Sequence, residues 1–253
     1  MNLKKYLAII AILLLATSNA VARESMREKA DRYYKYEEWE AAVSAYQKVL
    51  ADNPADMRAY GRSTVICGLL GLPDKQVEIL ERTQSYGLPL IELFAEVRKS
   101  AFEIGKPEIL ENFMLLVMER QPWLKRNIEL RLLQYYDFRN DAPRMIALSD
   151  SLLAVNPRDP STLRVKARGY MLEGNYGIAE KTYLQLLALR PDDFDAILNI
   201  GIIYYSEVET RKLPSTSPEA AEARKYLEKA FQMHPTEHLR QLIARLESPS
   251  RSE

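Results

Sequence analysis

The sequence predicts an all-α solenoid of about six stacked helix pairs followed by a C-terminal capping helix. Three observations lead to this fold class. Residues 161–193 contain two consecutive segments in which apolar residues recur at helical spacing. Prolines recur along the chain at nearly constant intervals, and a second series of turn-forming residues recurs in phase with them. Such periodicity is typical of repeat proteins, in which each unit packs mainly against its neighbours.

Residues 161–193 show what one repeat contains. Gly174 and Asn175 stand between the two helical segments, and both tolerate the left-handed backbone that a tight helix–helix turn needs. Proline follows the second segment, where it ends a helix without a clash inside it. Small residues are expected where the helices approach closely, with aromatic residues beside them. The residues that define the unit are, in order, Ala167, Tyr170, Tyr176, Ala179, Tyr183, Leu186 and Pro191.

The same order of residue types occurs near the start of the chain and again, in part, near its end. The first copy consists of Ala30, Tyr33, Trp39, Ala42, Tyr46, Val49 and Pro54. The last copy consists of Gly201, Tyr204, Ala223, Leu227, Ala230 and Pro235. This pattern resembles the tetratricopeptide repeat, a helix–turn–helix unit of about 34 residues. The resemblance implies a right-handed α-solenoid.

The two series of turn residues extend the repeat into the middle of the chain. Successive intervals between Pro54, Pro89, Pro122, Pro157, Pro191 and Pro235 are 35, 33, 35, 34 and 44 residues. Those between Gly71, Gly105, Asn140 and Gly174 are 34, 35 and 34 residues. We therefore predict repeats at about 24–55, 56–89, 90–122, 123–158, 159–193 and 194–237, with a capping helix and a disordered tail over 238–253. The longer last interval predicts a polar surface loop over 207–218.

Residues 1–22 have the composition of a secretory signal peptide. Lys4 and Lys5 precede an apolar run over 7–16, and small residues follow. This run is shorter than the about 20 residues of a membrane-spanning helix. We expect cleavage after Ala22, with cleavage after Ala20 or an uncleaved anchor as alternatives. The predicted mature protein is periplasmic, or alternatively secreted, and has no membrane span of its own.

Charge and motifs narrow the classes of partner and of chemistry. The formal net charge is zero for the whole chain and −2 without Lys4 and Lys5, whereas a nucleic-acid partner favours a basic surface. No phosphate-binding glycine loop, nucleophile elbow or paired-cysteine motif is present, so no cofactor and no enzymatic activity are expected. His234 and His238 are four residues apart, but Pro235 interrupts any shared helix, so no metal site is expected. Cys67 lies in an apolar helical stretch and is expected to be a buried, inert thiol.

The family resemblance also implies a concave groove lined by the first helix of each pair. Arg164 and Arg168 are four residues apart and share a helix face, where they could bind the carboxylates of a partner segment. Apolar and aromatic residues on the same faces would provide contact area. The alternative for each side chain is ordinary packing between repeats. The residues predicted to line the groove are Tyr34, Lys99, Phe102, Gln134, Arg164, Arg168, Met171, Ile202 and Tyr205.

These observations favour an exported, non-enzymatic scaffold that binds another protein or peptide segment in its groove. Because fold alone does not establish function, two other classes stay open. One is a structural subunit of a cell-envelope assembly or secretion complex. The other is an enzyme on a helical frame, such as a glycan-cleaving one, although the paired-carboxylate motif of such enzymes is not recognisable here.

Overall fold

The computed structural model describes residues 24–247, and these form 13 α-helices, one short 3-10 helix and no strand. The predicted signal peptide with both of its cleavage sites, and the last residues of the predicted tail, lie outside this range. None of the helices in the described range is both long enough and apolar enough to cross a membrane. The all-α class is confirmed.

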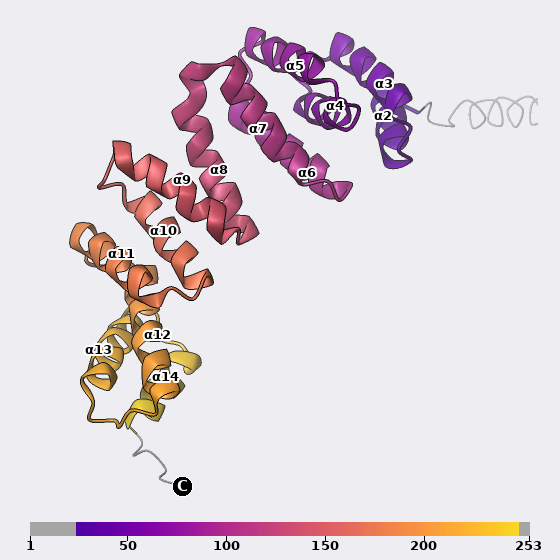
Figure 1. The fold of residues 1–253 in the computed structure, drawn as a ribbon. Coiled ribbons are helices and arrows are strands. Elements are labelled where there is room, and N and C mark those ends of the chain that lie inside the picture. Colours follow the sequence, from indigo (N-terminus) through magenta and orange to yellow (C-terminus); the bar gives the residue numbers. More distant parts are fainter. Residues whose placement is uncertain (1–23, 248–253) are drawn as a thin grey trace, which may run out of the picture. The chain divides into compact units, whose positions relative to one another are not determined.

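The described helices group into two compact units, of which the first ends at Leu124 and the second begins at Lys125 (Figure 1). The first unit contains three helix pairs and the 3-10 helix: α2 (Met26–Lys35) with α3 (Trp39–Asp52), α4 (Met57–Leu69) with α5 (Pro73–Ser85), and α6 (Leu90–Glu103) with α7 (Glu108–Arg120), followed by η1 (Pro122–Leu124). The second unit contains three pairs and one further helix: α8 (Lys125–Arg139) with α9 (Ala142–Val155), α10 (Pro160–Leu172) with α11 (Tyr176–Leu189), α12 (Phe194–Arg211) with α13 (Pro218–Met233), and α14 (Glu237–Glu247). Six helix pairs and a capping helix are therefore present, as predicted.

The turns within the helix pairs have the backbone that the series of glycines predicts. Gly71, Gly105 and Gly174 have φ of +65°, +68° and +72°, and Asn140 has φ of +54°. In each turn the next residue donates its N–H to the carbonyl five residues earlier, as Leu72 does to Cys67 at 2.8 Å. This bond satisfies a carbonyl at the end of the first helix. Glu37 closes the first pair in the same conformation, at φ +61°, although its residue type gives no such signal.

The small residues of the repeat lie where the helices pack most closely. The alanines of the three best-matched repeats have no exposed surface: Ala30, Ala42, Ala167, Ala179, Ala223 and Ala230. Tyr46 and Tyr183, which occupy equivalent positions, are also buried. Trp39 is only half-buried, and its ring meets the edge of Tyr34 with the ring centroids 5.6 Å apart. In the first repeat, Ala30, Ala42 and Tyr46 are therefore buried more deeply than Trp39.

The predicted polar loop over 207–218 is shorter than expected, because only residues 212–217 lie outside the helices. Helix α12 continues to Arg211 and ends at Lys212, which adopts the left-handed conformation with φ +51°. Val208 is buried, and Leu213 packs against the core around α13 and α14. These two apolar side chains explain why the segment folds against the core. Ser217 is the N-cap of α13, and its side chain accepts a hydrogen bond from the Ala220 N–H.

Helix α14 covers the last helix pair. Leu239, Leu242 and Leu246 lie on one side of this helix and are buried in the same core cluster as Ala223 and Leu227. A stacked repeat array needs such a helix over its final apolar face. The predicted capping role is confirmed for residues 237–247.

Candidate protein-interaction site

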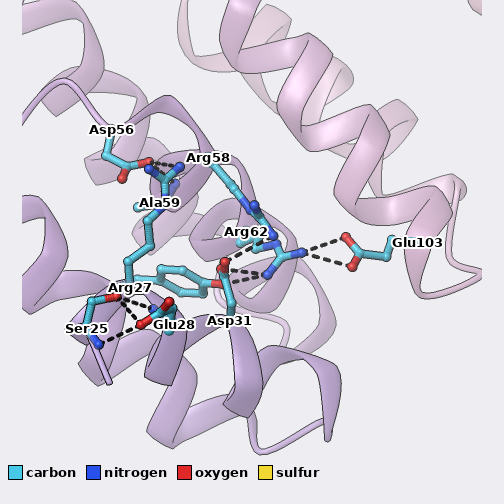
Figure 2. A network of polar contacts seen from close by, with 10 residues as sticks. Ser25, Arg27, Glu28, Asp31, Asp56, Arg58, Ala59, Arg62 and Glu103 are labelled. Carbon is cyan, nitrogen blue, oxygen red and sulfur yellow. Dashed lines mark hydrogen bonds and ion pairs between the residues drawn. The ribbon is translucent and has the colours of Figure 1, made fainter. Parts of the chain in front are cut away.

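In the first unit, the first helices of the three pairs are joined by a polar network (Figure 2). Asp31 of α2 accepts a hydrogen bond from Arg62 of α4 at 2.7 Å and forms an ion pair with Arg58 at 3.0 Å. Arg62 also donates to both carboxylate oxygens of Glu103 on α6, at 2.9 and 2.8 Å. A single guanidinium thus connects three helices that are far apart in the sequence.

Arg62 is buried, with 4% of its surface exposed. Its guanidinium stacks on the Tyr34 ring, 4.4 Å from the centroid, and donates to the Tyr46 hydroxyl at 3.0 Å. Burial by itself lowers the pKa of Arg62, but the bond to Tyr46 and the charges of Asp31 and Glu103 outweigh burial and raise it. Arg62 is therefore a fixed cation at the centre of the network.

Tyr34, predicted to line the groove, belongs to the core instead. Only 1% of its surface is exposed, and its hydroxyl donates to the Ser100 carbonyl at 2.8 Å. Burial raises the pKa of its phenol. The repeat places Tyr34 on the groove side of α2, but Arg62 covers its ring. The Tyr34 ring therefore packs against the guanidinium of the buried Arg62.

Two other predicted residues of this unit do reach the surface. Lys99 is exposed, and Phe102 has 39% of its surface exposed. Both lie on α6, as does the half-exposed Glu103. The first unit therefore presents an aromatic ring, a cation and a carboxylate from one helix, beside the polar network.

In the second unit, Arg164 of α10 is not an unpaired cation. Its guanidinium forms a hydrogen-bonded ion pair with Asp193 and lies 3.5 Å from a carboxylate oxygen of Asp195. Asp193 is buried and is the N-cap of α12, where it accepts a hydrogen bond from the Ala196 N–H at 3.1 Å. The bond to Asp193 is the main reason why the pKa of Arg164 is raised. The arginine therefore joins one repeat to the start of the next.

The first unit contains the same arrangement at the equivalent positions. Arg27 of α2 lies 3.3 Å from Asp56, which is buried and caps α4 through the Ala59 N–H. Each arginine precedes its aspartate by 29 residues. Two copies of one ion pair, each at the same place in its repeat, indicate a packing role for Arg164. The constant spacing of 29 residues between arginine and aspartate was a signal for this ion pair in the sequence.

Arg168 is also paired within the chain. It donates to both the backbone carbonyl and the side chain of Asp137 on α8, and to the side chain of Asn140. Asn140 is the left-handed residue that closes the turn after α8. A glycine there would provide the turn but not the side-chain acceptor. Arg164 and Arg168 thus both lie on α10, and both already have partners within the chain.

The remaining predicted residues of the second unit lie on the first helices of its pairs and are buried to different extents. Gln134 on α8 is exposed. Met171 on α10 is half-buried and packs against the core around Ala167 and Tyr183. Ile202 and Tyr205 on α12 are likewise half-buried and pack against the last core cluster. Met171, Ile202 and Tyr205 therefore pack against the core and are also partly exposed at the surface.

Within residues 24–247 no group of three or more histidine, cysteine, aspartate or glutamate side chains could hold a metal ion. His234 is the C-cap of α13, and its ring meets the edge of Phe194 with the centroids 4.6 Å apart. His238 lies in the first turn of α14. A break in the helix therefore separates the two histidines, as Pro235 predicts.

No known family and no curated protein matches the chain. Its structure is similar to the C-terminal part of a TPR repeat-containing protein from Cytophaga hutchinsonii, at 16% identity and TM-score 0.46, covering 82% of this chain and 78% of that one. It is also similar to a tetratricopeptide repeat protein from Parabacteroides merdae, at 15% identity and TM-score 0.40, covering 88% and 98% of the two chains. A third similar structure is the TPR2AB domain of yeast Sti1 in complex with pHSP90, at 12% identity and TM-score 0.40, covering 88% and 97%.

The helix pairs, their left-handed turns and the buried alanines at fixed positions of the repeat define a tetratricopeptide-like fold.

Proposed function

We propose that this chain is a non-enzymatic scaffold that binds a segment of a partner protein on the first helices of its repeats. The observation that carries the proposal is the surface of α6, where Phe102 and Lys99 are accessible beside a pre-arranged network of charges that includes Glu103. Side chains held in place by neighbouring helices lose little freedom on binding. An aromatic ring next to opposite charges suits a peptide with an apolar residue flanked by polar ones.

In the second unit, a partner carboxylate would have to compete with the chain's own carboxylates. Arg164 and Arg168 are both half-exposed, as are Asp137 and, more so, Asp195. A partner carboxylate could replace Asp195 on Arg164 while the bond to the buried Asp193 persists. The Arg164 guanidinium would then bind both Asp193, which joins it to the next repeat, and the carboxylate of the partner.

The proposal is tested by photo-crosslinking at two matched positions of one helix pair. Phe102 on α6 and Leu115 on α7 are 39% and 40% exposed, and each is replaced in turn by benzoylphenylalanine. We expect the probe at position 102 to crosslink a discrete partner in the cell-envelope fraction. The probe at position 115, on the second helix, is expected to give no such product.

A further substitution, Lys99→Glu, should weaken the crosslink at position 102 while leaving the free energy of unfolding within about 0.5 kcal/mol, because the side chain is exposed. Equal crosslinking from both helices, or none from either, contradicts binding on the first helices.

We also propose that the protein is exported and acts in the periplasm. Lys4, Lys5 and the apolar run over 7–16 support this proposal, as does the small-residue sequence up to Ala22. N-terminal sequencing of the protein from the envelope fraction should give Arg23 as the first residue. Recovery from the cytoplasm with Met1 retained would contradict export.

A further inference from the structure

The first unit contains a cavity of about 420 Å³ between α3, α4 and α5. Its walls are mainly apolar and include Val43 and Leu50 of α3 and Ile79 of α5. Cavities of roughly 300–1,000 Å³ are typical of sites for small organic ligands. Most of the lining comes from the second helices of two pairs, so this cavity is distinct from the surface of α6 that we propose for partner binding.

Two hydroxyl groups in the wall of this cavity have no hydrogen-bond acceptor. Tyr60 is fully buried and Ser63 is 4% exposed, and neither hydroxyl finds an acceptor within the described residues. Both belong to α4 and line the cavity. Buried polar groups are almost always hydrogen-bonded, so two such hydroxyls in one wall indicate a place for a ligand with an acceptor atom.

A cation lies at the same end of the cavity. The Arg82 guanidinium donates to the Leu50 carbonyl at 3.0 Å, which uses one of its five N–H groups. Arg82 and Tyr60 both line the cavity. Burial raises the pKa of Tyr60, while the charge of Arg82 and a hydrogen bond with its side chain lower that pKa. Hydroxyl and guanidinium donors thus converge where α3 ends and α4 begins.

Acidic side chains border the other end. Glu40 precedes Leu50 by ten residues on α3, which is about 15 Å along a helix. Glu78 is neutralised by Lys75, whose ammonium lies 2.8 Å from its carboxylate. An anionic group is therefore favoured only at the end that holds Arg82 and Tyr60.

We propose that this cavity binds a small carboxylate with an apolar tail. The carboxylate would accept hydrogen bonds from Tyr60, Ser63 and Arg82, and the tail would lie against Val43, Leu50 and Ile79. An apolar side chain of a partner protein could fill the same space, but it would leave both hydroxyls without an acceptor. The proposal does not depend on the proposed scaffold function.

Calorimetric titration with decanoate and with decanol tests the ligand class. Decanoate should bind at one site and more tightly than decanol, because only the carboxylate forms charge-assisted bonds. Tyr60→Phe and Arg82→Gln should each weaken decanoate binding about tenfold, the effect of one lost bond to a charged group. Tyr86→Phe is the matched control: Tyr86 is half-exposed, does not line the cavity, and should leave binding unchanged.

Cys67 reports on occupancy of the same cavity. The chain has one cysteine, which is buried and lines the cavity, and burial raises the pKa of its thiol. Saturating decanoate should slow alkylation of Cys67 by iodoacetamide about tenfold, as bound ligand blocks access to a buried thiol. If decanoate gives no heat of binding and does not slow the alkylation of Cys67, the proposed site is overturned. If decanol binds as tightly as decanoate and Tyr60→Phe does not change its binding, the proposal that the ligand is a carboxylate is overturned. If a leucine-rich peptide binds and decanoate does not, the cavity belongs to a protein partner instead.

Discussion

Replacing Arg62 with methionine should lower the free energy of unfolding by about 3 kcal/mol. This value is at the lower end of the range for breaking a buried ion pair, because Asp31 and Glu103 keep partial access to water. The substitution removes the hydrogen bonds to Asp31, Glu103 and Tyr46. It keeps an unbranched side chain over the Tyr34 ring, so the loss reports on the charge more than on packing.

Arg58→Met is the matched control for this prediction. Arg58 forms an ion pair with the same carboxylate, Asp31, from the same helix, but its side chain is 37% exposed. Its replacement should cost less than about 1 kcal/mol, as is usual for exposed pairs. Urea unfolding measures both values, and hydrogen exchange should show lost protection in α2, α4 and α6. Equal effects of the two substitutions would mean that the burial of Arg62 is not what makes its ion pairs important.

Replacing Gly61 with alanine should destabilise the first unit by about 2–3 kcal/mol, although alanine favours helices. A Cβ at this position would lie 2.6 Å from the Glu96 Cβ and 2.9 Å from the Glu96 carbonyl carbon. These contacts are with α6 close to its backbone, so no side-chain rotation relieves them. Helices α4 and α6 would have to move apart, and Val97 and the other core residues between them would lose contacts.

Gly177→Ala provides the opposite expectation. Gly177 also lies within a helix, α11, but a Cβ there would meet nothing within 4 Å. Alanine should therefore stabilise the protein by up to about 1 kcal/mol through helix propensity alone. Thermal unfolding of the two variants should show shifts of opposite sign. A stabilising Gly61→Ala would contradict the close approach of α4 and α6.

The arrangement of helix pairs was predictable because it depends on local chemistry. Gly71, Gly105 and Gly174 close their turns with positive φ, a conformation that glycine adopts without steric cost. The N-cap at Ser217 follows from its hydroxyl and from the proline in the first turn of α13. Glu37 was not predictable as a left-handed residue, because nothing in its own chemistry favours that conformation.

The candidate site was predictable only in part, for a physical reason that the arginines make clear. Residues 164 and 168 share a helix face by periodicity alone, so their common orientation followed from the sequence. Helix periodicity did not give their partners, because Asp137 and Asp193 lie 31 and 29 residues away and meet the arginines only through the packing of α8, α10 and α12. For Asp193 alone, the 29-residue spacing shared with Arg27 and Asp56 was a signal in the sequence.

By itself the sequence determined the helices, most of their turns and the alanines between them, since neighbouring residues in the chain decide these. The tertiary structure decided which charges are already paired, that Arg62 covers Tyr34, and that Cys67 lines a cavity with two hydroxyls that have no acceptor. Such features depend on side chains brought together from separate helices, and no local pattern encodes the distance between them.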